Sequence, residues 1–401
     1  MPKLWAGIDA GKFEHHCVVI DDDGNKCFSR RFENDENTLL ELISTVTDLA
    51  VGHELVWATD LSSGGSALLI ALLRDHGQTL LYIPGRIIHH AAATYQGEGK
   101  TDAKDAAIIA DQARMRRDLH PVRTGDQISV DLKILTSYRT DVMHDRVRAI
   151  NRLRAMLLEY FPALEHAFDY SKNKAALVLL SKYQTPEALR RIGGARLQSW
   201  LKARGCRNSA KVAGLAIDAA QSQRTTTATQ TVGAAITARL ARQIIEIDAT
   251  LSELDKQIDE KFQQHEHAEI LTSMPGFGSL SGAILLAATG GNMEAFASAD
   301  KLATAAGLAP APRDSGRISG NLHRPRRFNR QLLRICYLAA FSSLKNSHAS
   351  RTFYDRKRRE GKSHKQALLA LARRRINVLW AMLRYHTTYR EPTLQTLPIS
   401  A

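Results

Sequence analysis

The chain has 401 residues, a mass of 44.4 kDa and a formal net charge of +14. Its length allows two or three domains, and its content of 44% hydrophobic and 24% charged residues argues against general disorder. No apolar run approaches the roughly 18–20 residues that a membrane-spanning helix needs, and the N-terminus lacks the apolar core of a signal peptide. We therefore expect a cytoplasmic protein without a membrane partner.

The basic excess is unevenly distributed along the chain. Residues 1–125 hold 13 basic and 18 acidic side chains, a net of −5, and residues 126–401 hold the other 42 and 23, a net of +19. This asymmetry predicts chemistry in the first part and a grip on a polyanion in the second. The four cysteines are scattered without a CxxC pair, which predicts neither a zinc site nor a disulfide framework.

The first third alternates strand and helix signals. Short apolar runs predict strands, apolar residues at helical spacing predict helices, and the Asp/Asn/Gly-rich stretch 21–25 predicts a hairpin turn. Three antiparallel strands followed by alternating helices and strands predict an α/β domain with the ribonuclease-H-like order. In chain order we expect strands at 4–9, 15–20 and 27–32, a helix at 36–50, a strand at 54–59, a helix at 67–74, a strand at 79–83 and a helix at 101–117.

The middle of the chain predicts two long helices, at 128–160 and 232–262, where apolar residues recur at spacings of three and four. Residues 166–230 between them predict an inserted helical subdomain. The long helices fit an internal hairpin and a zipper between subunits equally well. The second has a heptad-like stripe made of Ile236, Leu240, Ile244, Ile247, Leu251, Leu254 and Ile258.

The chain from residue 269 onward predicts a helical, basic region. Residues 274–278, Met-Pro-Gly-Phe-Gly, predict a tight turn that resembles the hairpin of helix-hairpin-helix modules, in which peptide N–H groups at a helix start can meet a phosphate. Taken alone, the motif favours an ordinary connection between helices.

Four acids are candidates for chemistry. Asp9 and Asp60 end neighbouring predicted strands, and Asp102 and Asp105, three residues apart, share one face of a helix start. Each has an ordinary structural explanation by itself. A ribonuclease-H-like sheet brings all four to one point, where their repulsion favours binding of Mg²⁺ or Mn²⁺, and two such ions clamp the reacting oxygens in phosphoryl transfer. Glu98 is a possible further ligand.

The second candidate feature is a loop rich in Gly, Pro and Ser at 307–320, followed by an arginine-rich stretch. Arginine suits phosphate oxygens, so these residues predict nucleic-acid binding. A further basic run, 351–375, includes Phe353 and Tyr354, for which a core role is favoured over stacking on bases. The candidate arginines are Arg313, Arg317, Arg324, Arg326, Arg327, Arg330 and Arg334.

Within this loop, Ser315 and Ser319 are the candidate nucleophiles. His323 is the only nearby histidine, which leaves a protease-like triad without support. A serine that attacks a phosphate next to a carboxylate–metal cluster needs no such base. The residue types do not decide between the two serines.

In order along the chain, these motifs resemble those of the DEDD-type insertion-sequence transposases, which join a RuvC-like domain to a C-terminal catalytic-serine domain (insertion-sequence family one-ten). The resemblance extends over roughly residues 1–385. The ordered set of motifs is quite specific. It consists of the stretches 7–9, 59–60, 100–106, 275–278 and 307–316.

The resemblance implies a DNA recombinase that excises and inserts its own mobile element. It implies that Asp9, Asp60, Asp102 and Asp105 bind Mg²⁺, and that Ser315, from the partner domain or another subunit, attacks DNA to give a covalent phosphoserine intermediate. At the second acid the family often has Glu, whereas this chain has Asp60 with its shorter reach. The resemblance further implies an element-encoded bridge RNA that pairs with donor and target DNA, and tetramers assembled from dimers.

These expectations give an α/β plus all-α fold class with four parts. They are a RuvC-like DEDD catalytic domain at 1–125, a helical, coiled-coil-like region at 126–268 that includes the insertion, a C-terminal serine transposase domain at 269–390 and a tail at 391–401. The expected partners are DNA, a guide RNA and further copies of the chain. We expect a bacterial-type cytoplasmic protein that is associated with the nucleoid when it acts.

Three alternatives lead to different experiments. A RuvC-like endonuclease that uses water as nucleophile would not need Ser315. An actin-like ATPase would explain Gly7-Ile8-Asp9-Ala10-Gly11-Lys12 as a phosphate-binding strand start. That fold requires a second α/β domain with another glycine-rich phosphate turn, whereas residues 126–401 offer only basic helices. A non-catalytic nucleic-acid-binding scaffold would show steep salt dependence of binding without metal-dependent strand breakage.

Overall fold

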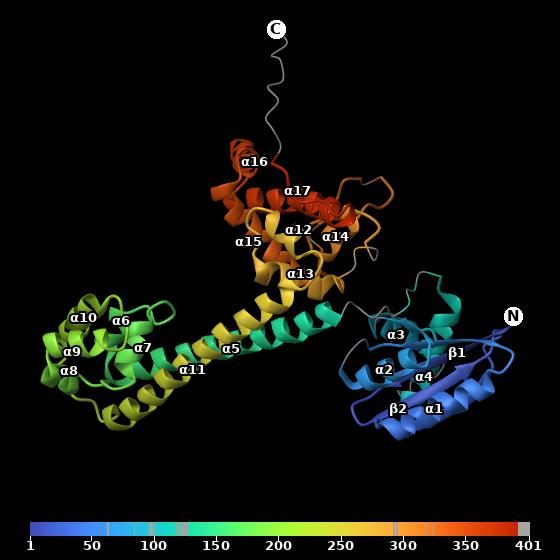
Figure 1. Ribbon diagram of the computed structural model, residues 1–401, viewed down its shortest axis with the longest axis horizontal. Helices are drawn as coiled ribbons and strands as arrows, with labels where there is room; N and C mark the ends of the chain where they lie inside the picture. Colours follow the sequence, from blue (N-terminus) through green and yellow to red (C-terminus); the bar gives the residue numbers. More distant parts are fainter. Residues whose placement is uncertain are drawn as a thin grey trace, which may run out of the picture. The chain divides into compact units, whose positions relative to one another are not determined.

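The computed structural model describes residues 1–61, 64–83, 85–95, 99, 101–117, 119, 121, 127–291, 293, 296–317, 319–323 and 325–391. The chain forms two compact units, residues 1–124 and 125–401 (Figure 1). The first unit is α/β, and the second is almost entirely helical. None of the described helices is both long and apolar enough to cross a membrane.

The first unit is built on a five-stranded mixed sheet with the order β3-β2-β1-β4-β5. The first three strands are antiparallel neighbours, and the last two run parallel to β1. This order is consistent with the predicted ribonuclease-H-like domain. The strands are β1 (Lys3–Ala10), β2 (Glu14–Ile20), β3 (Lys26–Glu33), β4 (Glu54–Thr59) and β5 (Thr79–Tyr82), each within one residue of its predicted bounds.

Helices cover both faces of this sheet. Because side chains alternate along β1, Leu4, Ala6 and Ile8 are buried against α1 (Glu36–Leu49) and α2 (Ala67–Asp75) on one face. The other face carries α4 (Asp102–Met115), which packs on β1 and β2, and α3 (Gly85–Ala92) lies against α4. Helix α3 was missing from the predicted elements, because it is short and only Ile88 among its described side chains is fully buried.

Gly7 explains why α4 lies so close to the sheet. A Cβ atom at this position would lie 2.2 Å from the carbonyl oxygen of Ala106 and 2.4 Å from the peptide nitrogen of Ala110. The backbone of α4 therefore rests directly on the middle of β1, where only glycine leaves enough room. This contact sets how near the first turn of α4 comes to the end of β1.

The second unit is organised around two long helices, α5 (Gln127–Tyr160) and α11 (Gln230–Gln263), which pack along each other within the chain (Figure 1). The internal hairpin is therefore the arrangement observed. Most of the predicted stripe of α11 is buried within the chain, but Ile236 is 38% exposed there. Near its start α11 buries Gly233, against the ring of Tyr160, and Thr237 instead, which turns Ile236 away from α5.

The segment between the two long helices is the predicted helical insertion. It folds around its own core, which also includes apolar residues of α5 and α11. The 223–229 stretch that leads into α11 has no regular secondary structure other than a turn at its end. The helices of the insertion are α6 (Pro162–Ala167), α7 (Lys174–Leu180), α8 (Pro186–Ile192), α9 (Gly194–Lys202) and α10 (Ser209–Ser222).

The C-terminal part of the second unit is a helical bundle with one short hairpin. The turn at 274–278 packs tightly, since a Cβ atom on Gly276 would lie 2.4 Å from the carbonyl oxygen of Ala339 and the guanidinium of buried Arg375 donates to the carbonyl of Pro275. These contacts support the prediction of a helix connection. The elements are α12 (Ala268–Ser273), α13 (Ser279–Thr289), α14 (Ala299–Ala305), β6 (Ala311–Pro312), β7 (Leu322–His323), α15 (Arg330–Asn346), α16 (His348–Arg359) and α17 (His364–Arg384).

Candidate active site

The four predicted acids line one cavity of about 770 Å³ in the first unit. Asp9 lies near the end of β1, and Asp60 directly follows β4. Strands β1 and β4 are parallel, and Ile8 pairs with Thr59. Asp9 and Asp60, the residues that follow this pair, therefore lie next to each other at the same edge of the sheet. Asp102 and Asp105 lie in the first turn of α4. The juxtaposition that the spacing predicted is thus present.

The opposite wall of the cavity was not predicted. It consists of Ile88, His89 and Ala92 from α3 and of Tyr95, which follows that helix. Lys104, in the first turn of α4, adds a cation to the lining. No motif in the sequence marks this wall, because α3 contributes to the site by its position against α4.

Asp60 is partly buried at the end of β4. Burial raises the pKa of its carboxyl group, and the negative charge of Asp105 raises it further, while the peptide N–H groups of Asp60 and Ala10 act in the opposite direction. Its Oδ1 atom is buried and has no hydrogen-bond partner among the described residues. Such an oxygen is energetically costly when ionised unless a cation or a donor satisfies it.

Asp102 is paired with a cation that the sequence analysis missed. The Arg31 guanidinium, on β3, lies 3.0 Å from Asp102 Oδ2 and 3.1 Å from Glu14 Oε2. The register of the antiparallel strands places Arg31 opposite His16, and His16 opposite Asp9, so the three lie in one row across the sheet. The hairpin turn at 21–25 was the signal that could have given this register.

His16 lies between Asp9 and Arg31 in this row. Burial lowers the pKa of the His16 imidazole, and the charge of Arg31 lowers it further, while Asp102 raises it. Its Nε2 atom lies 3.0 Å from the hydroxyl of Ser29. His16 therefore stays neutral at pH values where an ordinary histidine begins to gain a proton, and Arg31 remains the cation beside Asp102.

The donor set partly fits a divalent cation. Four carboxylates in one cavity are the hard ligands that Mg²⁺ or Mn²⁺ takes, and one of them, Asp60, has a buried oxygen without a partner among the described residues. In the part of the chain that the structure describes, however, no three His, Cys, Asp or Glu side chains are grouped closely enough to hold a metal ion. The ion pair between Asp102 and Arg31 is one contact that keeps a carboxylate from such a group.

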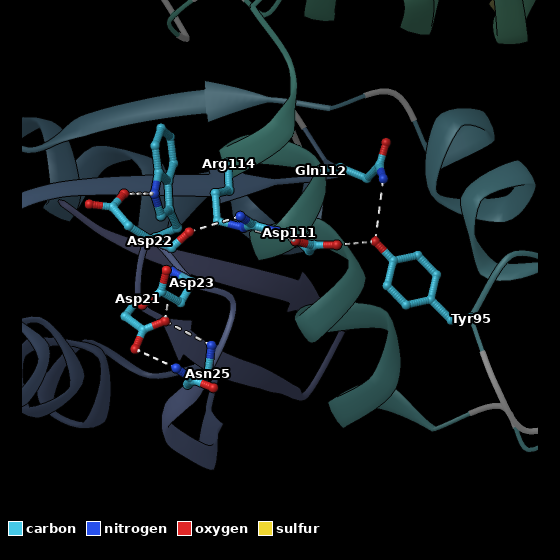
Figure 2. A network of polar contacts seen from close by, with 9 residues as sticks. Asp21, Asp22, Asp23, Asn25, Tyr95, Asp111, Gln112 and Arg114 are labelled. Atoms are coloured by element: carbon cyan, nitrogen blue, oxygen red, sulfur yellow. Dashed lines mark hydrogen bonds and ion pairs between the residues drawn. The ribbon is translucent and has the colours of Figure 1, made fainter. Parts of the chain in front are cut away.

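A polar network connects the wall of the cavity to α4 and to the β2–β3 turn (Figure 2). The hydroxyl of Tyr95 donates to Asp111, burial raises the pKa of this phenol to about 12, and it therefore stays protonated. The Arg114 guanidinium donates to Asp111 at 2.7 and 3.0 Å and to the carbonyl of Asp22 at 2.8 Å. The network fixes Tyr95, and with it one side of the cavity.

The candidate nucleophile lies in the second unit. Ser315 is exposed, between the short paired strands β6 and β7. The loop closes on itself, because Arg313 N–H donates to the carbonyl of Asn321 at 2.9 Å and Asn321 N–H donates to Asp314 Oδ1 at 2.9 Å. Asp314 is thereby engaged by the loop backbone. Ser319 is also exposed, so exposure does not separate it from Ser315.

The described arginines of this stretch have no acidic partner among the described residues. Six of the seven candidates are described, all six are exposed, and none forms an ion pair with another residue that the structure describes. The six are Arg313, Arg317, Arg326, Arg327, Arg330 and Arg334. The seventh candidate, Arg324, and the possible metal ligand Glu98 lie outside the described residues.

The arginine-rich stretch also lines a pocket, and the second basic run contains two aromatic residues. Arg326 and Arg330 line an open pocket of about 630 Å³ together with Phe328. In the other basic run, Phe353 and Tyr354 are partly buried against the C-terminal core, and cations of α16 and α17 lie 5.0–5.6 Å from the Phe353 ring. These contacts support the core role predicted for the two aromatic residues.

An α/β unit with an acid-lined cavity, in one chain with a basic helical unit, is the architecture expected of a DNA-processing enzyme. Two family models match the chain and refine this class. A transposase model of the DEDD IS110 type matches residues 6–162, and a model of the IS116/IS110/IS902 transposase family matches residues 268–355.

Full-length relatives agree with these matches. The chain is 59% identical to the 42 kDa protein of insertion element IS900 of Mycobacterium paratuberculosis, over 97% of this chain and 98% of the relative. It is 47% identical to the 44.8 kDa protein of IS116 of Streptomyces clavuligerus, over 95% of both chains. A mini-circle putative transposase for IS117 of Streptomyces coelicolor is 29% identical over 91% of this chain and 90% of its own length. The chain belongs to the IS110 family of insertion-sequence transposases.

Proposed function

We propose that this transposase cleaves and rejoins DNA strands through a covalent phosphoserine intermediate formed on Ser315, in cooperation with a divalent cation held by Asp9, Asp60, Asp102 and Asp105. The observation that carries the proposal is the convergence of the four acids on one cavity. The exposed Ser315 supports it from the second unit, because the neighbouring stretch of the chain carries exposed arginines that form no ion pair with a described residue.

The acids would hold Mg²⁺ or Mn²⁺, which when bound stabilises the negative charge that develops on a reacting phosphate. Asp60 would contribute the buried Oδ1 atom that has no hydrogen-bond partner among the described residues. Asp102 would have to exchange its ion pair with Arg31 for the cation. Arg31 would then be released next to the site, where a guanidinium suits a phosphate oxygen.

The proposed reaction needs no external energy source. A bond forms between Ser315 Oγ and phosphorus as the bond from phosphorus to the leaving strand oxygen breaks. The serine loses its proton, and the leaving oxygen gains one. Rejoining reverses these changes with a new strand end as nucleophile, so the energy of the phosphodiester is conserved through the covalent intermediate. The exposed arginines near Ser315 would hold the DNA backbone during this exchange.

The remaining parts of the proposal follow from the family resemblance. We assign catalysis by the acids to residues 1–125, the helical region to 126–268 and the serine domain to 269–390. An element-encoded bridge RNA would select donor and target DNA, and a dimer or tetramer would be the active form. The +19 net charge of residues 126–401 supports a partner that is a nucleic acid.

The decisive experiment is to trap the covalent intermediate. The protein, with its co-purified RNA, is incubated with supercoiled DNA and Mg²⁺, and protein-linked strand ends are mapped by mass spectrometry. We expect linkage at Ser315, its loss in Ser315→Ala, and its retention in the matched control Ser319→Ala. Asp9→Ala should abolish cleavage.

Cleavage that survives in Ser315→Ala without a protein–DNA link would instead support the water-using endonuclease. DNA binding without any metal-dependent breakage would support a scaffold.

A further inference from the structure

The helical insertion carries a charged surface that the proposed reaction does not use. Residues 162–229, all of which the structure describes, contain eleven basic and four acidic side chains. Within them the stretch 188–217, named here the basic segment, contains seven basic and no acidic side chains. It runs from α8 through α9 into α10.

Three of the four acids of the insertion are occupied by neighbouring cations. Glu165 is buried and accepts from Arg154 at 2.7 Å, Asp169 pairs with Lys172 at 3.3 Å, and Glu187 pairs with Arg190 at 3.3 Å. Asp218 alone is left to offset the basic segment. The positive charge there is therefore largely uncompensated within the insertion.

A buried hydrophobic core lies beneath the basic side chains. Four of them fall between residues 202 and 211, where α9 connects to α10, and the core below includes the buried Leu197, Leu201 and Val212. All seven are exposed, and six of them form no ion pair with any residue that the structure describes. These six are Arg191, Arg196, Lys202, Arg204, Arg207 and Lys211.

The rest of the surface argues against a protein or a membrane as the occupant. In residues 162–229 only Leu215 is a large exposed hydrophobic side chain, with 36% exposure. Protein interfaces and membrane-surface helices need a larger apolar patch than one such residue provides. The complementary ligand is therefore a polyanion.

The aromatic residues of the insertion argue for a duplex over a single strand. Single-stranded nucleic acids bind by stacking bases on exposed rings. Trp200 and Tyr183 instead pack edge to face, with their ring centroids 5.1 Å apart, and the Arg204 guanidinium covers Trp200 at 3.9 Å. The basic segment therefore provides positive side chains that can bind the phosphates of a duplex.

We propose that the basic segment binds the backbone of duplex DNA independently of sequence, through side chains other than those proposed for strand cleavage. The proposal rests on membership in a transposase family, whose substrate is DNA, and not on the serine mechanism. Each phosphate contact releases bound counterions, so binding through this segment adds to the salt dependence of DNA affinity. The insertion would thus hold DNA that flanks the reacting strands.

The test is a triple variant of the full chain, Lys202→Gln/Arg207→Gln/Lys211→Gln. Its affinity for a labelled duplex of random sequence is measured by fluorescence anisotropy over a range of salt concentrations, in EDTA so that no cleavage occurs. Because each lost phosphate contact removes about 0.9 from the slope of log affinity against log salt, we expect the slope to fall by about 2 to 3.

A charge-matched control is Lys133→Gln/Arg152→Gln/Lys256→Gln, three exposed residues of α5 and α11 that form no ion pair with a described residue. It should leave the slope nearly unchanged, and thermal unfolding checks that both variants fold. An unchanged slope in the first variant, or equal losses in both, would overturn the proposal. A loss confined to an RNA hairpin probe would also overturn it, in favour of RNA. The assay involves no strand cleavage, so its failure is separate from failure of the serine mechanism.

Discussion

Asp60 shows how the folded chain changes the chemistry of a single carboxyl group. Its side chain is partly removed from solvent and lies near Asp105, and these surroundings raise its pKa above the value in the unfolded chain. Folding therefore favours the protonated form. Ionised Asp60 thus lowers the free energy of unfolding at pH values above its pKa in the folded chain. This loss is absent below its pKa in the unfolded chain, which is about 3.9 for an aspartate.

Replacing Asp60 with Asn should consequently raise the melting temperature of the metal-free protein at pH 7 by a few degrees. The gain should shrink as the pH falls through the folded pKa of Asp60 and disappear near the unfolded pKa. Thermal unfolding in EDTA, followed by circular dichroism from pH 7 down to pH 4, measures the difference.

The exposed acid Asp23 offers a control, since Asp23→Asn should give no such pH-dependent gain. Added Mg²⁺ should stabilise the natural chain more than Asp60→Asn, because a ligand stabilises the state that binds it. A variant that melts below the natural protein at pH 7 would contradict the assignment of Asp60 as a destabilising ionised group.

At the scale of elements, the contact between β1 and α4 determines whether the acids meet. The strand carries Asp9 and the helix carries Asp102 and Asp105, and Gly7 is the point where their backbones touch. The Tyr95–Asp111–Arg114 network connects the opposite wall of the cavity to the same helix (Figure 2). Helix α4 is thus held from both sides.

Gly7→Ala should push α4 off the sheet and destabilise the protein by about 1–3 kcal/mol, the usual range for overpacking a tight contact. Hydrogen exchange measured by mass spectrometry should become faster in the peptide that spans α4.

Gly214→Ala is the matched control, because Gly214 lies inside α10 with nothing within 4 Å of its added Cβ atom. There we expect a gain of about 0.5–1 kcal/mol and unchanged exchange in α4. Unchanged exchange in α4 of Gly7→Ala would show that the helix tolerates the displacement.

For the whole molecule, the proposed catalytic groups are divided between two units. The acids belong to residues 1–124 and Ser315 to residues 125–401. The charges are divided in the same way, −5 for the front and +19 for the remainder. A reaction that needs both groups then depends on how units are brought together, either in one chain or between chains.

Complementation tests the second possibility. Chains with Asp102→Ala and chains with Ser315→Ala should each be inactive, and their mixture should regain strand cleavage if a site combines acids of one subunit with the serine of another. A random mixture in a dimer would restore a fraction of the natural activity, measured on supercoiled DNA. No recovery, despite mixed oligomers detected by differential tags, would argue that both groups act from the same chain.

Much of the fold could be predicted because its signals are local. The hairpin turn at 21–25, the strand and helix bounds of the first third and the two long helices depend on periodicity and turn chemistry within short stretches. The predictions failed where local signals were weak or misleading. Helix α3 has only eight residues, and Ile236 continues the heptad-like spacing although its end of α11 buries Gly233 and Thr237 instead.

By itself, the sequence determined the order of elements, the separation of charge along the chain and which acids end strands or begin a helix. Only the tertiary structure decided that Arg31 pairs with Asp102, that α4 touches β1 at Gly7 and that one buried oxygen of Asp60 has no hydrogen-bond partner among the described residues. The reason is physical. Propensity and periodicity act between residues near in sequence, whereas ion pairs, close backbone contacts and pKa shifts depend on distances across strands and helices that exist only after folding.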